Sequence, residues 1–378
     1  MFNHIHIVSF NVPSPPNYGG VIDVYYKLKH LHELGIKIHL HCFVYNRLPD
    51  PELNNFCEKV YYYDRNTNPL LNFCKTPYIV LSRKSEKLLN NLLADDAPIL
   101  FEGMHSCYYI NNKKLKDRLL IYRESNIEHN YYMQLCRAEN KVYKKLFYFI
   151  ESLKLKRFEK QLSHSNLMFI VSKSDYDYLQ DKFPDNKVVY LPSFHANNDV
   201  ISKSGKGDYV LYHGNLSVAE NEKAAIYLIA NVIEQMPDTK FVIAGLNPSQ
   251  RLKNKVATYN NIELVESPDS RTMQNLISDA QIHIMFTFQA TGLKLKLLNT
   301  LYSGRYVICN DKMLSGTGLE DLCITANNPS EIISKINNYM NTEFSVSDIE
   351  KRKAILSENY SNKRNAEKLV SEIKKVSL

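Results

Sequence analysis

One stretch of the sequence, residues 282–310 (IHIMFTFQATGLKLKLLNTLYSGRYVICN), constrains the fold more than any other. It begins with apolar residues at alternate positions, as in a buried strand: Ile282, Ile284 and Phe286. Leucines then recur at the spacing of one helical face: Leu293, Leu297, Leu298 and Leu301. Gly304 ends the predicted helix, and residues 306–309 (YVIC) predict a second strand. A strand, a helix and a second strand in this order form half of a parallel α/β layer.

The predicted helix also indicates a binding site, because ligands of such sheets bind beyond the carboxyl ends of the strands. The helix opens at Thr291-Gly292, with Lys294 and Lys296 just inside it. Free backbone N–H groups, the helix dipole and two ammonium groups together suit a phosphate. An exposed basic turn on a buried amphipathic helix explains the same pattern equally well. Side chains two residues apart on a helix diverge, and we expect Lys294 to contribute more than Lys296.

The rest of the chain repeats the alternation of strands and helices. Residues 4–43 predict a βαβ unit whose loop, residues 11–20 (NVPSPPNYGG), lacks the GxGxxG fingerprint of dinucleotide-binding proteins. The polar residues 197–208 are the best linker, because a strand and a glycine loop follow them. The pattern predicts an α/β fold with doubly wound parallel sheets. Its parts are an N-terminal domain at 1–196, a second domain at 209–360, and a C-terminal helix at 361–378 that returns toward the first domain.

Composition limits the classes of function. A chain of 378 residues predicts two domains, and a net charge of +7 suits acidic small molecules or an anionic membrane surface but does not indicate nucleic acid. Seven cysteines without CxxC or Cys/His pairing predict reduced thiols and no metal site. A strand begins at once, and no apolar run reaches about 20 residues. We therefore expect no signal peptide and no membrane span.

Charged residues follow several predicted strands at their carboxyl ends, where an active site is expected. Glu102 and His105 follow the strand at 99–102, and His105 is a candidate general base or sugar contact. Arg123 and Glu128 follow the next strand. His213 stands beside the glycine of the second domain's first loop, where it can contact phosphate. A histidine that caps a turn and a surface ion pair are the alternatives for these residues.

Residues 128–162 predict one or two helices that carry many basic residues. The lysines at 141, 144, 145, 154, 156 and 160 and Arg157 are interleaved with Leu146, Phe147, Phe149, Ile150 and Leu153. Such a segment can lie on an anionic membrane. A solvated helix face is the simpler interpretation of a run of charges.

The order of these features resembles the retaining group-1 glycosyltransferases of GT-B fold, over nearly the whole chain. The loop 15–20 matches the family's P-x-x-GG, and His213-Gly214-Asn215 matches the loop that opens its second domain. Residues 119–128 resemble its R-x-H-N-x-E segment, and Val171-Ser172 its V-S motif. The most specific match is to its motif G-x-K-x-K-x-L-E-A, on residues that include Gly292, Lys294, Lys296, Leu298 and Gly304.

The resemblance implies two Rossmann-like domains that face each other across a cleft, and transfer of a sugar without metal or cofactor. The donor, a nucleoside-diphosphate sugar, would meet His213, Gly214, Asn215, Thr291, Gly292, Lys294, Lys296 and Asn299. The catalytic candidates are His105, Glu102 and Lys294. The acceptor or phosphate loop would include Tyr18, Gly19, Gly20, Arg123 and Glu128. The acceptor is expected to be a glycan or lipid-linked glycan in polysaccharide biosynthesis, at the cytoplasmic face of a membrane.

The chain departs from the family's pattern at several positions. Thr291 and Asn299 stand where the family has its pair of glutamates, Asn215 stands at the position of an arginine, and Ser125 replaces a histidine. Asn299 still offers hydrogen bonds to a ribose. Two other functions remain for such a chain: a GT-B-like binding protein without catalysis, and a UDP-sugar 2-epimerase.

Overall fold

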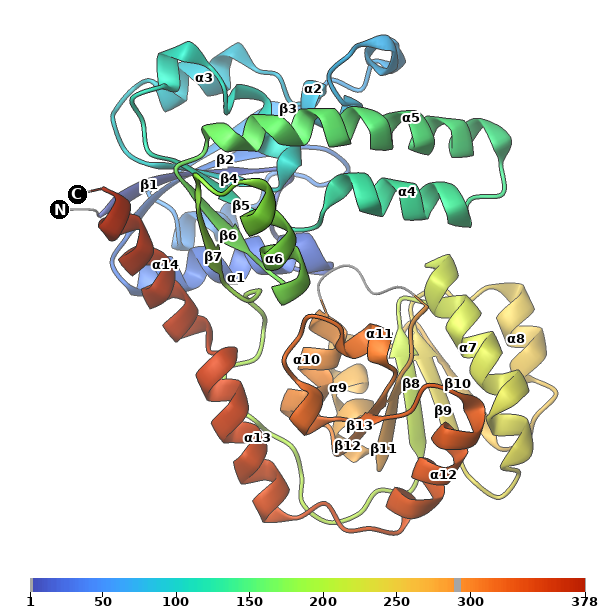
Figure 1. Cartoon of the computed structure of the whole chain (residues 1–378). Coiled ribbons are helices and arrows are strands. Elements are labelled where there is room, and N and C mark those ends of the chain that lie inside the picture. The colour runs from blue at the N-terminus through green and yellow to red at the C-terminus, as the bar shows by residue number, and fades with distance from the viewer. Residues whose placement is uncertain (1–2, 289–293, 378) are drawn as a thin grey trace. The chain divides into compact units, whose positions relative to one another are not determined.

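The computed structural model describes residues 3–288 and 294–377, which form two compact units. The first unit contains the chain up to Ala196 and the C-terminal residues from Tyr360 onward. The second unit begins at Asn197 and ends at Asn359. Each unit is an α/β domain with its own parallel sheet (Figure 1), so the predicted fold class is confirmed.

The first unit is built on a seven-stranded parallel sheet of order β3-β2-β1-β4-β5-β6-β7. Its strands are β1 (His4–Ser9), β2 (Lys37–Val44), β3 (Lys59–Asp64), β4 (Ile99–Glu102), β5 (Leu120–Arg123), β6 (Leu167–Ile170) and β7 (Lys187–Tyr190). Its helices are α1 (Gly19–Glu33), α2 (Tyr78–Leu81), α3 (Glu86–Leu92), α4 (Glu128–Ala138), α5 (Val142–Phe158), α6 (Lys173–Lys182) and α14 (Asn362–Val376).

Helices cover both faces of this sheet, which explains why its strands read as nearly continuous apolar runs. Helices α1 and α14 pack on one face, where Leu28 and Leu369 have no exposed surface. Helices α2, α3, α5 and α6 cover the other, around side chains such as Leu155 and Leu179. The long basic segment is a hairpin of α4 and α5 (Figure 1), not one continuous helix.

The second unit is built on a six-stranded parallel sheet of order β10-β9-β8-β11-β12-β13. Its strands are β8 (Val210–Gly214), β9 (Phe241–Gly245), β10 (Ile262–Glu266), β11 (Ile282–Met285), β12 (Tyr306–Cys309) and β13 (Ile324–Thr325). Its helices are α7 (Ala219–Asn231), α8 (Gln250–Val256), α9 (Ser270–Asp279), α10 (Leu295–Ser303), α11 (Asp311–Leu314), α12 (Pro329–Met340) and α13 (Val346–Asn359).

Helix α10 ends where the sequence predicts, at Gly304. It begins at Leu295, with Lys294 as its N-cap residue, and the predicted opening at Thr291-Gly292 lies outside the described residues. It ends at Ser303, and Gly304 has an extended backbone, so no left-handed turn requires glycine there. The requirement is steric: a Cβ on Gly304 would lie 2.2 Å from Nε2 of His283. Among the described residues, no helix combines the length and apolar character that a membrane span requires.

Candidate active site

At the carboxyl edge of the first sheet, His105 lies close to an acidic residue of α4. Its Nδ1 is 3.8 Å from Oε1 of Glu128, and its ring centroid is 5.4 Å from that of Phe10. Gly103 makes this possible: with φ +67 it turns the chain out of β4, and a Cβ there would lie 3.2 Å from Nδ1 of His105. The prediction that His105 stands at this edge agrees with the structure. Its catalytic role stays a prediction.

The two groups of this pair hold unusual protonation states. Glu128 is 1% exposed, and burial raises its pKa to about 8, although a hydrogen bond from Ser125 and the charge of Arg83 act in the opposite direction. Burial holds the pKa of His105 well below its ordinary value, and the charge of Arg83 adds to this effect. At pH 7 the pair is therefore largely a carboxylic acid beside a neutral imidazole. A neutral imidazole can accept a proton from a hydroxyl group.

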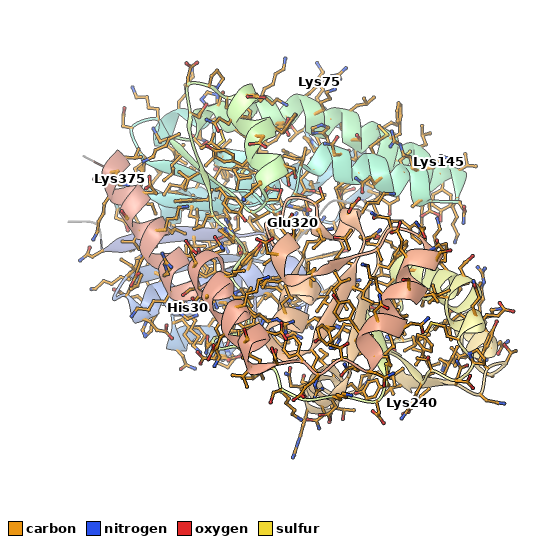
Figure 2. All side chains as sticks on the ribbon, turned by 60° about the horizontal axis from the view of Figure 1, so that its bottom comes forward. His30, Lys75, Lys145, Lys240, Glu320 and Lys375 are labelled. Atoms are coloured by element: carbon orange, nitrogen blue, oxygen red, sulfur yellow. The ribbon has the colours of Figure 1, made fainter. Side chains whose placement is uncertain are left out.

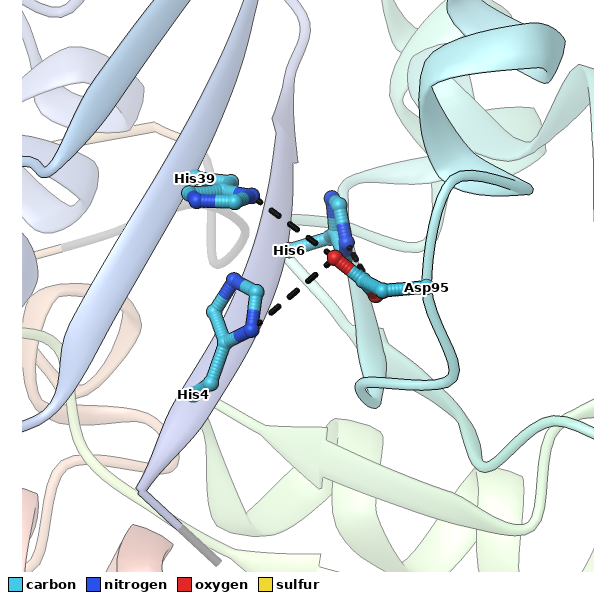
Figure 3. Close-up of side chains that lie close together, drawn as sticks. All are labelled: His4, His6, His39 and Asp95. Carbon is cyan, nitrogen blue, oxygen red and sulfur yellow. Dashed lines mark hydrogen bonds and ion pairs between the residues drawn. The ribbon is translucent and has the colours of Figure 1, made fainter.

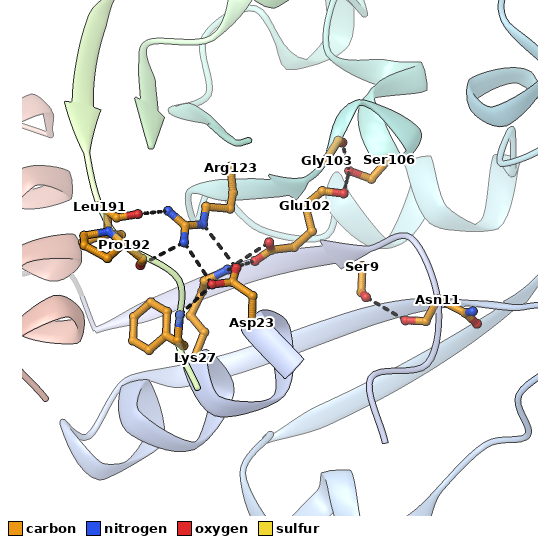
Figure 4. Close-up of polar contacts among 11 residues, drawn as sticks. Ser9, Asn11, Asp23, Lys27, Glu102, Gly103, Ser106, Arg123, Leu191 and Pro192 are labelled. Carbon is orange, nitrogen blue, oxygen red and sulfur yellow. Dashed lines mark hydrogen bonds and ion pairs between the residues drawn. The ribbon is translucent and has the colours of Figure 1, made fainter. Parts of the chain in front are cut away.

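The structure turns Glu102 and Arg123 inward, into a buried network (Figure 4). Nζ of Lys27 donates to both carboxylate oxygens of Glu102, at 2.7 and 2.9 Å, and to Asp23 at 2.9 Å. Arg123 donates to Asp23 at 2.9 and 3.2 Å and to the carbonyl of Leu191 at 2.6 Å. These contacts tie α1 to the ends of β4 and β5. They give Glu102 and Arg123 a structural position, in place of the substrate contacts predicted for them.

Charge compensation inside this network is strong. Burial alone would raise the pKa of Asp23, but the nearby charges of Arg123 and Lys27 hold it below its usual range. Burial raises the pKa of Glu102, against the attraction of Lys27. Removing one partner of such a buried set leaves the others uncompensated, which typically costs about 3–5 kcal/mol.

The loop between β1 and α1 carries the predicted phosphate-loop residues. Tyr18 is 43% exposed and its hydroxyl accepts a hydrogen bond from Asn11 at 3.3 Å. Helix α1 begins at Gly19. A Cβ on Gly20 would lie 2.7 Å from Cζ of Phe10, so glycine lets the helix start directly against the strand end. Arg47 braces the loop by donating to the carbonyl of Val12 at 2.7 Å.

In the second unit, the loop from β8 to α7 lies at the carboxyl edge of the sheet. His213 is 5% exposed, its Nε2 lies 3.0 Å from Oγ1 of Thr300, and burial lowers its pKa to about 3. Its side chain therefore points into the domain, and the predicted phosphate contact through this ring is not supported. The side chain of Asn215 accepts hydrogen bonds from Ser217, and its carbonyl accepts one from Asn221 at 2.9 Å.

Lys296 points from the first turn of α10 to this same loop. Its Nζ donates to Oδ1 of Asn221 at 3.3 Å and lies 5.8 Å from the ring centroid of Tyr212. Burial lowers its pKa, and the charge of Glu220 partly opposes that. Lys296 is thus only partly exposed and is not the surface lysine of the alternative interpretation. The structure places the ammonium group of Lys296 at this edge, and the relative contributions of Lys294 and Lys296 stay a prediction.

Not all predicted donor residues are described. Thr291 and Gly292 lie outside the described residues, Lys294 is half-buried at the N-cap of α10, and Asn299 is half-buried within α10. Sequence reasoning also missed Glu220, which accepts hydrogen bonds from the hydroxyl of Thr287 and from the N–H of Phe288. The sequence signal for Glu220 was its position in the first turn of the helix that follows the glycine loop.

Comparison with known proteins identifies relatives of both the second unit and the whole chain. Residues 207–342 match the family model described as glycosyl transferases group 1. The chain is 27% identical over 386 residues to an uncharacterized 44.6 kDa protein in the cps region of Klebsiella pneumoniae, with 95% of this chain and 97% of that protein covered.

Solved structures share the fold at low identity. An α,α-trehalose-phosphate synthase (UDP-forming) from Burkholderia vietnamiensis is similar with a TM-score of 0.66 at 10% identity, covering 100% of this chain and 98% of that one. The pneumococcal O-GlcNAc transferase GtfA, in complex with UDP and GlcNAc, has a TM-score of 0.64 at 10% identity, covering 99% of each chain. These likenesses confirm the predicted GT-B fold.

Proposed function

We propose that the chain is a glycosyltransferase that transfers a sugar from a nucleoside-diphosphate sugar to a glycan or lipid-linked glycan. The match of residues 207–342 to the family model described as glycosyl transferases group 1 supports this activity. Complexes of similar fold hold UDP with a sugar, which supports UDP as the leaving group. The cps region of the Klebsiella pneumoniae relative supports a role in polysaccharide biosynthesis. We further propose a retaining reaction that needs no metal at the donor.

The observation that carries this proposal is Lys296. Among the described residues its ammonium group meets the amide oxygen of Asn221, and no carboxylate lies within ion-pair distance. A partly buried cation that the charge of Glu220 offsets only in part is costly, and a bound diphosphate would compensate it further. As the bond to the sugar breaks, negative charge grows on the leaving phosphate, so a cation fixed there lowers the barrier.

The first unit supplies groups suited to an acceptor hydroxyl. His105 is neutral at pH 7 because its pKa lies well below 6.5, so its imidazole can accept a hydrogen bond or a proton. Protonated Glu128 can donate to the opposite side of the ring without adding charge. We assign His105 to contact with the acceptor or the transferred sugar, and Glu128 to orienting its ring.

An apolar stripe on α5 supports an acceptor at a membrane surface. Its members recur at helical spacing and are each at least 42% exposed: Val142, Leu146, Phe149, Ile150 and Leu153. Exposed lysines flank the stripe at positions 141, 144, 145 and 156, and Figure 2 shows Lys145 pointing outward from the hairpin. Lys154, predicted on this face, instead bonds Glu151 at 2.8 Å. An apolar stripe with basic flanks suits an anionic lipid surface.

Vesicle flotation tests the membrane proposal. The wild-type protein should float with vesicles that contain anionic lipid at low salt and sink with neutral vesicles. Leu146→Asp should abolish flotation, whereas Leu246→Asp, at a residue of similar exposure in the second unit, should not. Equal flotation of both variants would exclude α5 as the contact surface.

Transfer itself is tested in two steps with chelator present. A thermal-shift screen against UDP- and GDP-sugars identifies the donor, and nucleotide release is then measured with and without lipid-linked glycans. Release that requires an acceptor supports transfer. Donor binding without release under any condition would favour the inactive binding protein, for which Asn299 at the family's glutamate position is the supporting observation. Interconversion of the donor sugar without acceptor would indicate the epimerase.

A further inference from the structure

Four titratable residues gather at the amino edge of the first sheet, opposite to the edge that carries His105. His4 and His6 lie on β1, and His39 lies on β2 as the register partner of His6. Asp95 comes from the loop that precedes β4. One nitrogen or oxygen from each of the four lies within 4.8 Å of the others. Figure 3 shows the three rings turned to the carboxylate.

Hydrogen bonds assign different roles to the two oxygens of Asp95. Oδ1 lies 2.9 Å from Nε2 of His6, and Nδ1 of His6 lies 2.8 Å from Nε2 of His41. The hydroxyl of Tyr63 follows at 2.7 Å from Nδ1 of His41. Each ring can donate once and accept once along this chain, which ends at Oδ1. Oδ2 instead faces Nδ1 of His4 and Nδ1 of His39, each at 3.9 Å.

We propose that His4, His39 and Asp95 bind a divalent transition-metal ion of the zinc type, and that His6 positions the Asp95 carboxylate. Zinc bonds to nitrogen and oxygen of about 2.0–2.1 Å place tetrahedral ligands about 3.3 Å apart. The two observed separations from Oδ2 of Asp95, 3.9 Å each, exceed this by about half an ångström, and the ligand atoms of the group all lie within 4.8 Å of one another. A second hydrogen bond that fixes a metal-bound carboxylate is typical of such sites.

The surroundings of the cluster also suit a metal ion. Among the described lysines and arginines, Arg118 alone lies within ion-pair distance of Asp95. It is 3.6 Å from Oδ1, so Oδ2 is left for the metal ion. His4 has an Nε2 that is buried without a hydrogen-bond partner among the described residues. Protein contacts among the described residues therefore leave one nitrogen of His4 unused.

An open fourth position follows from the exposure of the site. The side chains of His4 and Asp95 are 24% and 32% exposed, and both line a surface cavity of about 710 Å³. Two imidazoles and one carboxylate with room for water are a donor set that zinc accepts. The sequence analysis predicted no metal site, although two H-x-H pairs, at 4–6 and 39–41, are a sequence signal for this cluster. The proposal departs from that expectation and rests on the grouping of the four side chains in the fold.

The test uses the full chain without a histidine tag, stripped by chelator and titrated with Zn²⁺ by calorimetry and with Co²⁺ by visible absorption. We expect one equivalent to bind and Co²⁺ to give the intense absorption of a four-coordinate site. Asp95→Asn and His39→Gln should each weaken binding at least 100-fold, and His6→Gln about 10- to 100-fold. His164→Gln, which removes an exposed histidine elsewhere, should leave binding unchanged.

Folding of each variant is checked by its thermal transition, and Zn²⁺ should raise the melting temperature of the wild type and of His164→Gln only. Equal affinity of the wild type and the folded Asp95→Asn variant would overturn the proposal, as would the absence of binding to the wild type. Because no donor or acceptor is present, neither result depends on the proposed glycosyl transfer.

Discussion

Replacing Lys296 by Met tests the donor site most directly, because Met keeps much of the length of the side chain and removes only the charge. Nζ of Lys296 lies 3.3 Å from Asn221, so its position is fixed to the β8–α7 loop. A phosphate at about 4 Å from this cation would interact with about 4 kcal/mol at an effective dielectric constant of about 20. The side chain is partly exposed, and screening reduces this value.

The remaining energy, about 2.7 kcal/mol, corresponds to about a 10²-fold loss in turnover when one such group is removed. If the contact strengthens as charge develops on the leaving phosphate, kcat and kcat/KM should fall together. Burial disfavours the charged form of Lys296, so its removal should leave the melting temperature unchanged or raise it slightly.

The assay is acceptor-dependent nucleotide release with the donor found by thermal shift, measured for Lys296→Met, Lys294→Met and Lys353→Met. Lys353 is exposed on α13 of the same unit and serves as the matched control. Turnover of Lys296→Met at the level of Lys353→Met would refute the assignment. A larger loss for Lys294→Met would restore the order predicted from the sequence.

Three further predictions concern single side chains. Glu128 has a pKa of about 8 in the folded protein against 4.5 ordinarily, so its contribution to stability is complete below pH 4.5 and is lost as pH rises to 8. Glu128→Gln should therefore flatten the fall in melting temperature between pH 5 and 8, and an unchanged profile would contradict the raised pKa. Lys27→Met should lower the free energy of unfolding, measured by chemical denaturation, by about 3–5 kcal/mol. Glu102→Gln should destabilise the protein less and retain its turnover per folded molecule. Loss of turnover in Glu102→Gln without loss of stability would support a catalytic role for Glu102. Asn299→Ala should raise the nucleotide Kd several-fold, about 1 kcal/mol, at nearly unchanged melting temperature in calorimetry; unaltered affinity would remove Asn299 from the site.

The fold was readable from the sequence because both sheets are parallel and covered on both faces. Such strands appear as apolar runs, and the expected strands at 99–102 and 306–309 match β4 and β12. Strand β13 was missed because two residues carry no periodicity. The pattern of leucines defines the buried face of α10 but not its first residue, which is Leu295 in the structure.

The sites were harder to predict from the sequence because they depend on the directions of side chains, which no local sequence pattern gives. Glu102 and His105 are three residues apart, yet one faces Lys27 inside the domain and the other faces Glu128 at its edge. The positive φ of Gly103 between them makes the difference. The metal-type cluster depends on the register of β1 with β2 and on a loop nearly 60 residues further along, which no local pattern contains.

Charge compensation offers a physical criterion that separates the structural from the functional groups of this chain. Asp23 and Arg123 are buried and ionised, and each has its partners within the protein, so a ligand would gain nothing by approaching them. Glu128 is buried to the same degree but stays protonated, because the charge of Arg83 does not offset its burial. Lys296 has its pKa lowered by burial and meets an amide oxygen in place of a carboxylate. Groups whose charge the fold leaves uncompensated are those that a substrate can compensate. By this criterion we propose that Glu128 and Lys296, and not the stronger ion network at Asp23, face the substrates.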